Sequence, residues 1–278
     1  MYKESVKSYF KEKSEEYDLT DEQMYWVLSD ELLWHIFQEE VLHKIGDSVN
    51  FVDAGAGTGR WSKKILDNYV NSNGLLLDLS KEMLAQAENK LQKDGTADRV
   101  IIKNVDLDIY DESNEIEKYD LAYSFHNVLG FVNEPKNVIG KMFNMVKKGG
   151  YVVCGVPNYY HNIYFGISTG NVELADKCVK SHRGQFTLDM PEMNMFTPEY
   201  LKEIYLELGI NVEGVYGFPV AIYPGMQETQ LHGETKKLVS ILSSKENYEK
   251  ILEIEKKLYK CEEAASRGNQ LLIIGKKK

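Results

Sequence analysis

The sequence contains 278 residues, of which 43% are hydrophobic and 27% charged, and this suits one elaborated domain or one domain with a smaller appendage. Acidic residues outnumber basic ones by 43 to 33, and the formal net charge of −10 disfavours nucleic acid as a partner because an acidic surface repels polyanions. No run approaches the about 18 apolar residues that a membrane span requires, and the first residues lack an apolar leader segment.

The three cysteines, Cys154, Cys178 and Cys261, have no C-x-x-C spacing and are too few for a disulfide framework or a zinc cluster. We therefore expect no metal site, no membrane partner and a cytoplasmic location. The oligomeric state stays open.

Residues 1–45 precede the first strand and are expected to be helical. Trp26, Leu33, Trp34 and Phe37 form a bulky apolar set on one predicted helix. Core packing is favoured over a wall of a substrate site for these side chains.

An apolar strand over 50–54 runs into three glycines at alternate positions, Gly55, Gly57 and Gly59, and then into a helix that begins near Arg60. Glycines let the backbone lie against a ligand without an intervening Cβ, and the start of the helix points free N–H groups at that ligand. A dinucleotide-binding loop would read G-x-G-x-x-G, but Arg60 stands where its third glycine belongs. The loop predicts a nucleotide-type pocket of another kind.

The second strand, 74–77, ends at Asp78, which follows Gly59 by 19 residues. A ribose-binding carboxylate is expected there, because a carboxylate can accept hydrogen bonds from two vicinal hydroxyls at once. Apolar segments follow over 100–107 and 119–129, and a helix is predicted from Glu134 to Lys147, ending at Gly149-Gly150.

Helical periodicity follows the short apolar strands along the first half of the chain. Apolar residues share one face after the glycine loop and again after Ser80, which is a good N-cap. Alternating strands and helices predict a parallel sheet with helices on both faces and ligands at the carboxyl ends of the strands.

The stretch Asp53-Ala-Gly-Ala-Gly-Thr-Gly59 resembles the first motif of the class I S-adenosylmethionine-dependent methyltransferases. Further matches follow in order: Asp78 at the end of the second strand, the segment that leads to Asp106, the segment after Tyr119-Asp120, and a glycine turn within 146–153. The resemblance implies S-adenosylmethionine as cofactor and S-adenosylhomocysteine as product. It also implies a Rossmann-like α/β fold, with a seven-stranded, mostly parallel sheet, helices on both faces, an N-terminal helical cap and lid insertions.

The resemblance also assigns binding roles. In the family, the acid at the position of Asp106 reads the adenine amino group, and the segment after Tyr119-Asp120, which includes Ser124, lies beneath the methyl donor. The leading helices fold over the cofactor, and a tyrosine at the position of Tyr17 commonly reaches the methionine carboxylate; a core or cap role for Tyr17 is the alternative. The implied cofactor-binding residues are Tyr17, Asp53, Gly55, Ala56, Gly57, Gly59, Asp78, Leu79, Asp106, Leu107 and Ser124.

Past Val156 the pattern changes. Residues 157–195 show no sustained period, and an insertion of this length after a strand predicts a lid rather than a linker. Thr197 as N-cap and Pro198 at the first helical position predict a helix that Gly209 ends. The predicted division is a cap over 1–45, a cofactor-binding core over 46–156, a lid or substrate insertion over 157–195, more core over 196–217, a second, largely helical insertion over 218–268, and a last strand with a tail over 269–278.

Methyl transfer requires the enzyme to align a nucleophile with the methyl group and to exclude water, and an acceptor that must lose a proton benefits from a base. Histidine is the natural base. His126 follows the fourth strand, whereas His161 and His182 belong to the first insertion; His126 and His161 are our catalytic candidates, with a structural role as the alternative. Tyr159, Tyr160 and Tyr164 supply stacking surfaces for an acceptor, or else anchor the lid.

The segment 124–127, Ser-Phe-His-Asn, lacks the Asn/Asp-Pro-Pro-Tyr/Phe motif of amino methyltransferases for adenine or glutamine, and the Pro-Cys of cytosine C5 enzymes. We therefore expect methyl transfer to an oxygen or nitrogen of a small-molecule acceptor. The alternatives are a tRNA- or RNA-modifying methyltransferase, a non-catalytic S-adenosylmethionine-binding regulatory protein, and a nicotinamide-dependent oxidoreductase. The glycine spacing and Asp106 argue against the last.

Overall fold

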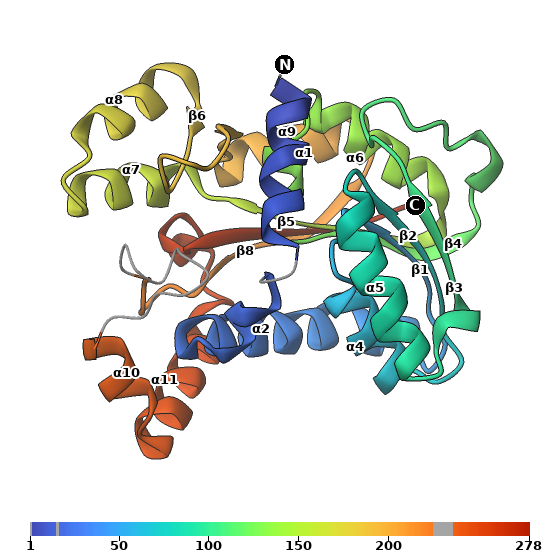
Figure 1. Ribbon diagram of the computed structural model, residues 1–278, viewed down its shortest axis with the longest axis horizontal. Helices are drawn as coiled ribbons and strands as arrows, with labels where there is room; N and C mark the ends of the chain where they lie inside the picture. Colours follow the sequence, from blue (N-terminus) through green and yellow to red (C-terminus); the bar gives the residue numbers. More distant parts are fainter. Residues whose placement is uncertain (1, 15–16, 225–235) are drawn as a thin grey trace.

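A seven-stranded sheet organises the computed structural model, which describes residues 2–14, 17–224 and 236–278 (Figure 1). The strand order is β3-β2-β1-β4-β5-β9-β8; β1 to β5 pair in parallel, and β9 runs antiparallel between β5 and β8. The strands are β1 (Asn50–Ala54), β2 (Asn73–Asp78), β3 (Val100–Asn104), β4 (Tyr119–Ser124), β5 (Val146–Pro157), β8 (Asn211–Phe218) and β9 (Gln270–Lys276). This topology confirms the expected mostly parallel, Rossmann-like α/β fold.

Helices cover both faces of the sheet because successive strand residues point to opposite sides. Phe51 and Tyr123 belong to one buried cluster with α2 and α4, whereas Val52 and Ala122 belong to a second cluster with α6 and α9. Figure 1 shows these two helical layers below and above the sheet. The helices are α2 (Met24–Phe37), α4 (Arg60–Asn68), α6 (Pro135–Met145) and α9 (Pro198–Glu207), and α5 (Lys81–Lys93) follows β2.

The predicted helix starts are confirmed at two positions. The Ser80 hydroxyl accepts a hydrogen bond from the Met83 N–H at 3.2 Å, and Thr197 caps α9 through the Tyr200 N–H at 3.1 Å. The helix predicted over 134–147 ends earlier, at Met145, because Val146 already pairs with Tyr119 as part of β5.

The N-terminal region is helical, as expected. It contains α1 (Tyr2–Lys13), a 3-10 turn η1 (Tyr17–Glu22), α2, a π-helical turn η2 (Gln38–Leu42) and α3 (His43–Ile45). Leu33, Trp34 and Phe37 are buried under the sheet, and half-buried Trp26 packs in a smaller cluster with Tyr25 and Leu242, so core packing is confirmed for this set.

The first insertion is more regular than its sequence indicates. The structure places two helices, α7 (Tyr159–Ser168) and α8 (Val172–Ser181), and a two-stranded ribbon, β6 (Arg183–Gly184) with β7 (Met193–Asn194), within 157–195. The sequence shows no sustained period there because each helix has only 10 residues, too few for its period to stand out. The Asn158 side chain starts α7 by accepting a hydrogen bond from the Tyr160 N–H at 3.0 Å.

The second insertion packs against α2, as Figure 1 shows at the lower left. It contains α10 (Lys236–Leu242), α11 (Lys245–Leu258) and the turn η6 (Glu262–Arg267); the part of it over 225–235 lies outside the described residues. Sequence reasoning missed Glu255, a fully buried carboxylate on α11 that accepts hydrogen bonds from the N–H groups of Val220, Ala221 and Ile222 at 2.8, 2.7 and 3.2 Å. These bonds fix α11 to the chain that leaves β8.

Three short 3-10 turns complete the core: η3 (Ala97–Arg99), η4 (Ser113–Glu115) and η5 (Val128–Gly130). No helix within 2–14, 17–224 and 236–278 has the length and apolar character needed to cross a bilayer.

Candidate active site

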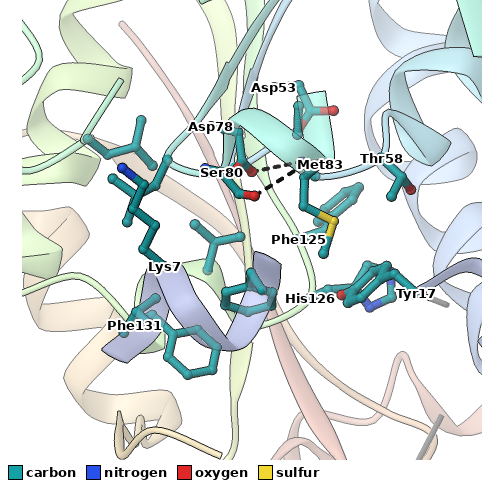
Figure 2. A pocket seen from close by; sticks show the side chains of 18 of the residues that line it. Lys7, Tyr17, Asp53, Thr58, Asp78, Ser80, Met83, Phe125, His126 and Phe131 are labelled. Carbon is teal, nitrogen blue, oxygen red and sulfur yellow. Dashed lines mark hydrogen bonds between the residues drawn. The ribbon is translucent and has the colours of Figure 1, made fainter. Parts of the chain in front are cut away.

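A cavity opens at the carboxyl ends of β1, β2 and β4, the edge at which parallel α/β sheets bind ligands (Figure 2). The loops that follow these strands and β3 form its floor and sides, and α1 and η1 cover it. Its lining residues are Lys3, Val6, Lys7, Phe10, Tyr17, Asp53, Gly55, Ala56, Gly57, Thr58, Arg60, Trp61, Asp78, Leu79, Ser80, Met83, Asp106, Leu107, Phe125, His126, Val128, Phe131 and Val132. Nine of the eleven predicted cofactor-binding residues are in this set; Gly59 and Ser124 are the exceptions.

The glycine loop is shaped for close approach of a ligand. Gly55 has φ of +96°, and a Cβ there would lie 2.4 Å from Cγ2 of Val128. Gly57 also has positive φ, +54°, but a Cβ there would meet no atom within 4 Å. The loop therefore packs closely at Gly55 and leaves open space at Gly57, which lines the cavity.

Asp78 lies at the end of β2 with its carboxylate held by backbone N–H groups. Oδ2 accepts from Gly57 at 2.8 Å and Oδ1 accepts from Ser80 at 2.7 Å. Burial raises the pKa of Asp78, and these backbone bonds oppose the rise. Since each carboxylate oxygen has two acceptor positions, both oxygens can still receive a ligand hydroxyl.

Asp53 is a second carboxylate beneath the loop. Oδ2 of Asp53 accepts hydrogen bonds from the hydroxyls of Ser62 at 2.6 Å and Tyr123 at 2.8 Å. Burial raises the pKa of Asp53 to about 7, with the two hydroxyl bonds opposing the rise. Asp53 is therefore an acid whose charge changes near neutral pH beside the cavity.

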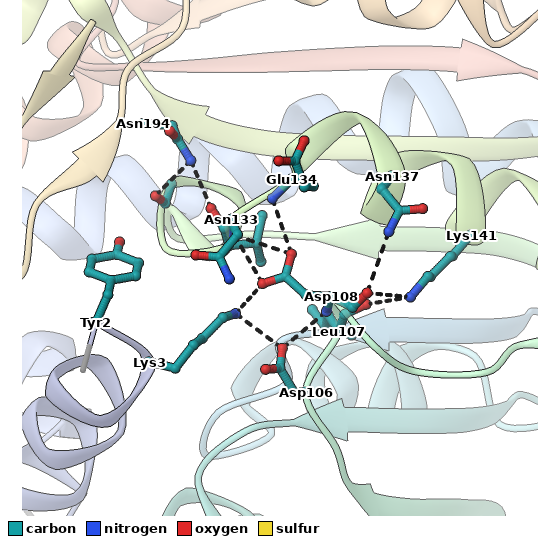
Figure 3. Close-up of polar contacts among 12 residues, drawn as sticks. Tyr2, Lys3, Asp106, Leu107, Asp108, Asn133, Glu134, Asn137, Lys141 and Asn194 are labelled. Carbon is teal, nitrogen blue, oxygen red and sulfur yellow. Dashed lines mark hydrogen bonds and ion pairs between the residues drawn. The ribbon is translucent and has the colours of Figure 1, made fainter. Parts of the chain in front are cut away.

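Asp106 is tied to the covering helix (Figure 3). Lys3 on α1 pairs with Asp106 Oδ1 at 3.0 Å and also with Oδ2 of Asp108. Asp108 in turn accepts hydrogen bonds from the N–H groups of Asn133 and Glu134. These bonds and the Lys3 ammonium lower the pKa of Asp108 against the effect of burial. The predicted adenine-reading acid thus also anchors the cap.

The Tyr17-Asp18 pair joins η1 to the glycine loop. The Asp18 carboxylate accepts hydrogen bonds from Thr58 Oγ1 at 2.6 Å and from Lys90 Nζ at 2.7 Å. Tyr17 lines the cavity next to Phe10 of α1, with ring centroids 6.4 Å apart, and burial raises its pKa to about 12. Its hydroxyl therefore remains protonated at neutral pH.

His126 lines the cavity in a strained turn after β4, with φ of +52°. Its Nε2 lies 3.5 Å from Oδ1 of Asp30 on α2, and NH2 of Arg60 lies 2.5 Å from the other oxygen of that carboxylate. Burial lowers the pKa of His126, and Asp30 partly offsets this. Sequence reasoning missed Asp30, because only the fold brings α2 beside the end of β4.

Several predicted site residues lie elsewhere. Ser124 is fully buried, and its hydroxyl donates to the Ala54 carbonyl at 2.7 Å, a bond between strands rather than a ligand contact. His161 is buried in the insertion among aromatic rings such as Phe165, Phe186 and Tyr223, and burial lowers its pKa to about 4. It lies outside the lining of the cavity, so the structure does not support it as a base there.

The predicted acceptor-binding tyrosines also lie outside the cavity lining. Tyr160 and Tyr164 are 45% and 54% exposed on α7, and Tyr159 stacks on His182 with ring centroids 4.6 Å apart. None of the three rings on α7 therefore lines the cavity. In the part of the chain that the structure describes, no group of three His, Cys, Asp or Glu side chains is placed to hold a metal ion.

The domain model, the two relatives and the solved structure described next are all methyltransferases. The model of a methyltransferase domain matches residues 52–152. Malonyl-[acyl-carrier protein] O-methyltransferase 2 of Ilyobacter polytropus is 28% identical over 104 residues, 37% of this chain and 38% of that protein. The tRNA 5-carboxymethoxyuridine methyltransferase of Escherichia coli K12 is 21% identical over 259 residues, 90% of this chain and 88% of that protein. The chain thus spans less than half the length of the malonyl relative.

A solved S-adenosylmethionine-dependent methyltransferase of Mesorhizobium loti has the same fold, with a TM-score of 0.53, 18% identity, and coverage of 84% of this chain and 93% of that one. The glycine loop, the two acids after β2 and β3, and the sheet order agree with the domain match. Residues 52–152 thus match a methyltransferase domain, within a sheet that has the fold of the S-adenosylmethionine-dependent methyltransferases.

Proposed function

We propose that this chain binds S-adenosylmethionine in the cavity and transfers its methyl group to an oxygen or nitrogen of a small-molecule acceptor, releasing S-adenosylhomocysteine. The observation that carries the proposal is the convergence of the Gly55–Gly59 loop, Asp78 and Asp106 on one cavity that α1 covers. S-adenosylmethionine supplies a methyl group on a sulfonium, which is its own leaving group. The protein has to bind, orient and exclude water.

The lining residues fit the parts of this ligand. Asp78 would accept the ribose hydroxyls, and Asp106 with Leu107 would hold the adenine. The open space at Gly57 leaves room for the methionine part, with Tyr17 and Asp53 close by. Val6, Phe10 and Phe131 lie on the covering side and would keep water from the reacting atoms.

A small acceptor is favoured by the covered cavity and by the net charge of −10. A tRNA acceptor is the second candidate, because the E. coli tRNA enzyme matches 90% of this chain. A cytoplasmic location belongs to the proposal and is supported by the three free cysteines, Cys154, Cys178 and Cys261.

Calorimetry tests cofactor binding first. We expect micromolar binding of S-adenosylmethionine and S-adenosylhomocysteine and none of NAD(H). Asp78→Ala should weaken binding by about 1.5–3 kcal/mol, because the ribose hydroxyls lose a charged acceptor. Asp67→Ala is the control, since Asp67 forms an exposed ion pair with Lys63. Equal affinity in Asp78→Ala and the wild type would reject the ribose assignment.

A screen that measures S-adenosylhomocysteine release then identifies the acceptor class. The panel contains small hydroxyl, amine and carboxylic acid compounds, together with bulk tRNA as a separate arm. Turnover with small compounds supports the proposal, and turnover confined to tRNA supports the second candidate. Cofactor binding without any turnover would indicate a non-catalytic binding protein.

A further inference from the structure

Two buried polar atoms face each other beside the cavity. His126 Nε2 lies 3.5 Å from Asp30 Oδ1, and within the described residues neither atom has a hydrogen-bond partner. Buried polar atoms are nearly always hydrogen-bonded, so two such atoms within reach of each other need a common explanation. We propose that Asp30 is the positioning residue that fixes the tautomer of His126, and that the acceptor at this site brings a proton, being a hydroxyl or an amine rather than a carboxylate.

The contacts of Asp30 determine which nitrogen of His126 carries hydrogen. Arg60 occupies Oδ2 of Asp30 at 2.5 Å, which leaves Oδ1 for the imidazole. An ionised carboxylate can only accept hydrogen bonds, and a neutral imidazole carries one N–H. Nε2 is therefore the donor toward Asp30, and Nδ1 keeps the lone pair.

The fold holds His126 in this orientation. His126 and Asn127 both adopt left-handed backbone conformations, with φ of +52° and +68°, which residues other than glycine rarely adopt. The Trp61 ring lies against the imidazole, with centroids 5.7 Å apart. Strained backbone conformations persist where the surrounding structure imposes them, and such residues cluster at functional sites. The imidazole is thus fixed between α2, α4 and the end of β4.

The inference rests on the proposed function, because it concerns the acceptor of the methyl group. As the acceptor oxygen or nitrogen bonds to the methyl carbon, the electron pair of the carbon–sulfur bond stays with sulfur, and the acceptor's proton passes to Nδ1 of His126. The positive charge lost by the sulfonium ends on the imidazolium, beside the Asp30 carboxylate. A carboxylate acceptor has no proton to lose at neutral pH, and its oxygen would be repelled by the Nδ1 lone pair. A hydroxyl or amine would find both a hydrogen-bond acceptor and a base.

Nitrogen-15 NMR of the His126 imidazole tests the positioning role without any acceptor. We expect the Nε2–H tautomer in the wild type. In Asp30→Asn, the side-chain oxygen should stay with the donor Arg60, so the NH₂ group would face Nε2 and the tautomer would invert to Nδ1–H. Asp67→Asn, an isosteric change in the exposed pair with Lys63, should leave the signals unchanged. A wild-type Nδ1–H tautomer would overturn the proposal, so the test does not depend on the variant folding.

A pH titration of the same signals gives a second readout. The charged groups that face His126 are Asp30 on α2 and Arg60 on α4; Asp30 raises the pKa of His126, whereas burial and Arg60 lower it. Asp30→Asn should therefore lower the pKa of His126, and Asp67→Asn should not change it. An unchanged pKa in Asp30→Asn would contradict the close pairing.

The acceptor class is tested with hydroxyl, amine and carboxylic acid compounds of the same carbon skeleton. Turnover should be confined to the hydroxyl or amine, and Asp30→Asn should lower kcat by about 10- to 1000-fold while S-adenosylmethionine affinity stays within about threefold. Turnover of the carboxylic acid would overturn this inference and leave the proposed function standing. Loss of S-adenosylmethionine binding in the wild type, by contrast, would reject the proposed function itself.

Discussion

Replacing Lys3 with methionine should loosen the helical cap over the cavity. Lys3 Nζ lies 3.0 Å from Asp106 Oδ1 and also pairs with Asp108, and the three side chains are 22%, 21% and 9% exposed. Partly exposed ion pairs contribute about 0.2–1 kcal/mol each, so together these two stabilise the closed cap by about 0.5–2 kcal/mol. That free energy corresponds to an increase of about 2- to 30-fold in the population of the open cap.

Hydrogen–deuterium exchange of the α1 amides measures this opening. Lys11→Met is the matched control, because Lys11 lies on the same helix in an exposed pair with Glu82 at 3.7 Å. Exchange in α1 should be about 2- to 30-fold faster in Lys3→Met and near the wild-type rate in Lys11→Met. High salt should reduce the difference by screening the ion pairs. Identical α1 exchange in Lys3→Met and the wild type at low salt would refute the reasoning.

Three further predictions concern stability and are measured by urea unfolding. Glu255→Ala should lower the free energy of unfolding by about 3–5 kcal/mol, because three backbone N–H groups lose a buried acceptor. Glu253→Ala, at an exposed position on the same helix, is the control, and an equal decrease in both variants would contradict the prediction. Gly55→Ala should destabilise the protein more than Gly149→Ala. Both glycines have positive φ, but only a Cβ at Gly55 would meet Val128, at 2.4 Å. Equal decreases in the free energy of unfolding would show that this contact relaxes freely. Because the pKa of Asp53 is raised to about 7 in the native state, the folded protein binds the Asp53 proton more tightly than the unfolded chain does. The contribution of this proton to the free energy of unfolding is fully present below about pH 4 and is lost as the pH rises through about 7. Asp53→Asn should therefore lose less stability than the wild type between pH 5 and 8, and an identical loss would place the pKa of Asp53 outside that window.

The sequence was sufficient to predict features that local rules determine. The glycine loop, the N-caps at Ser80 and Thr197, and the acids after β2 and β3 depend on neighbours a few residues away. Alternation of strand and helix then predicted the sheet and the edge where its ligand cavity lies. These features follow from backbone geometry and hydrophobic period.

The features that were missed depend on distant parts of the chain. Asp30 meets His126 across 96 positions, and Glu255 binds N–H groups that lie more than 30 positions earlier. Ser124 matched a family motif, but its hydroxyl bonds to a neighbouring strand. A local sequence pattern cannot tell which of these contacts the fold creates.

The position of β9 has a consequence for how the protein acquires its fold during synthesis. β9 follows the other six strands in the chain, yet it lies between β5 and β8 and pairs with both along its length. Until residues 270–276 leave the ribosome, the edges of β5 and β8 that pair with β9 have no partner. Unpaired strand edges promote aggregation. The order of synthesis therefore makes the final strand the step that closes the sheet, and we infer that a nascent chain stalled before β9 depends on chaperones to stay in solution.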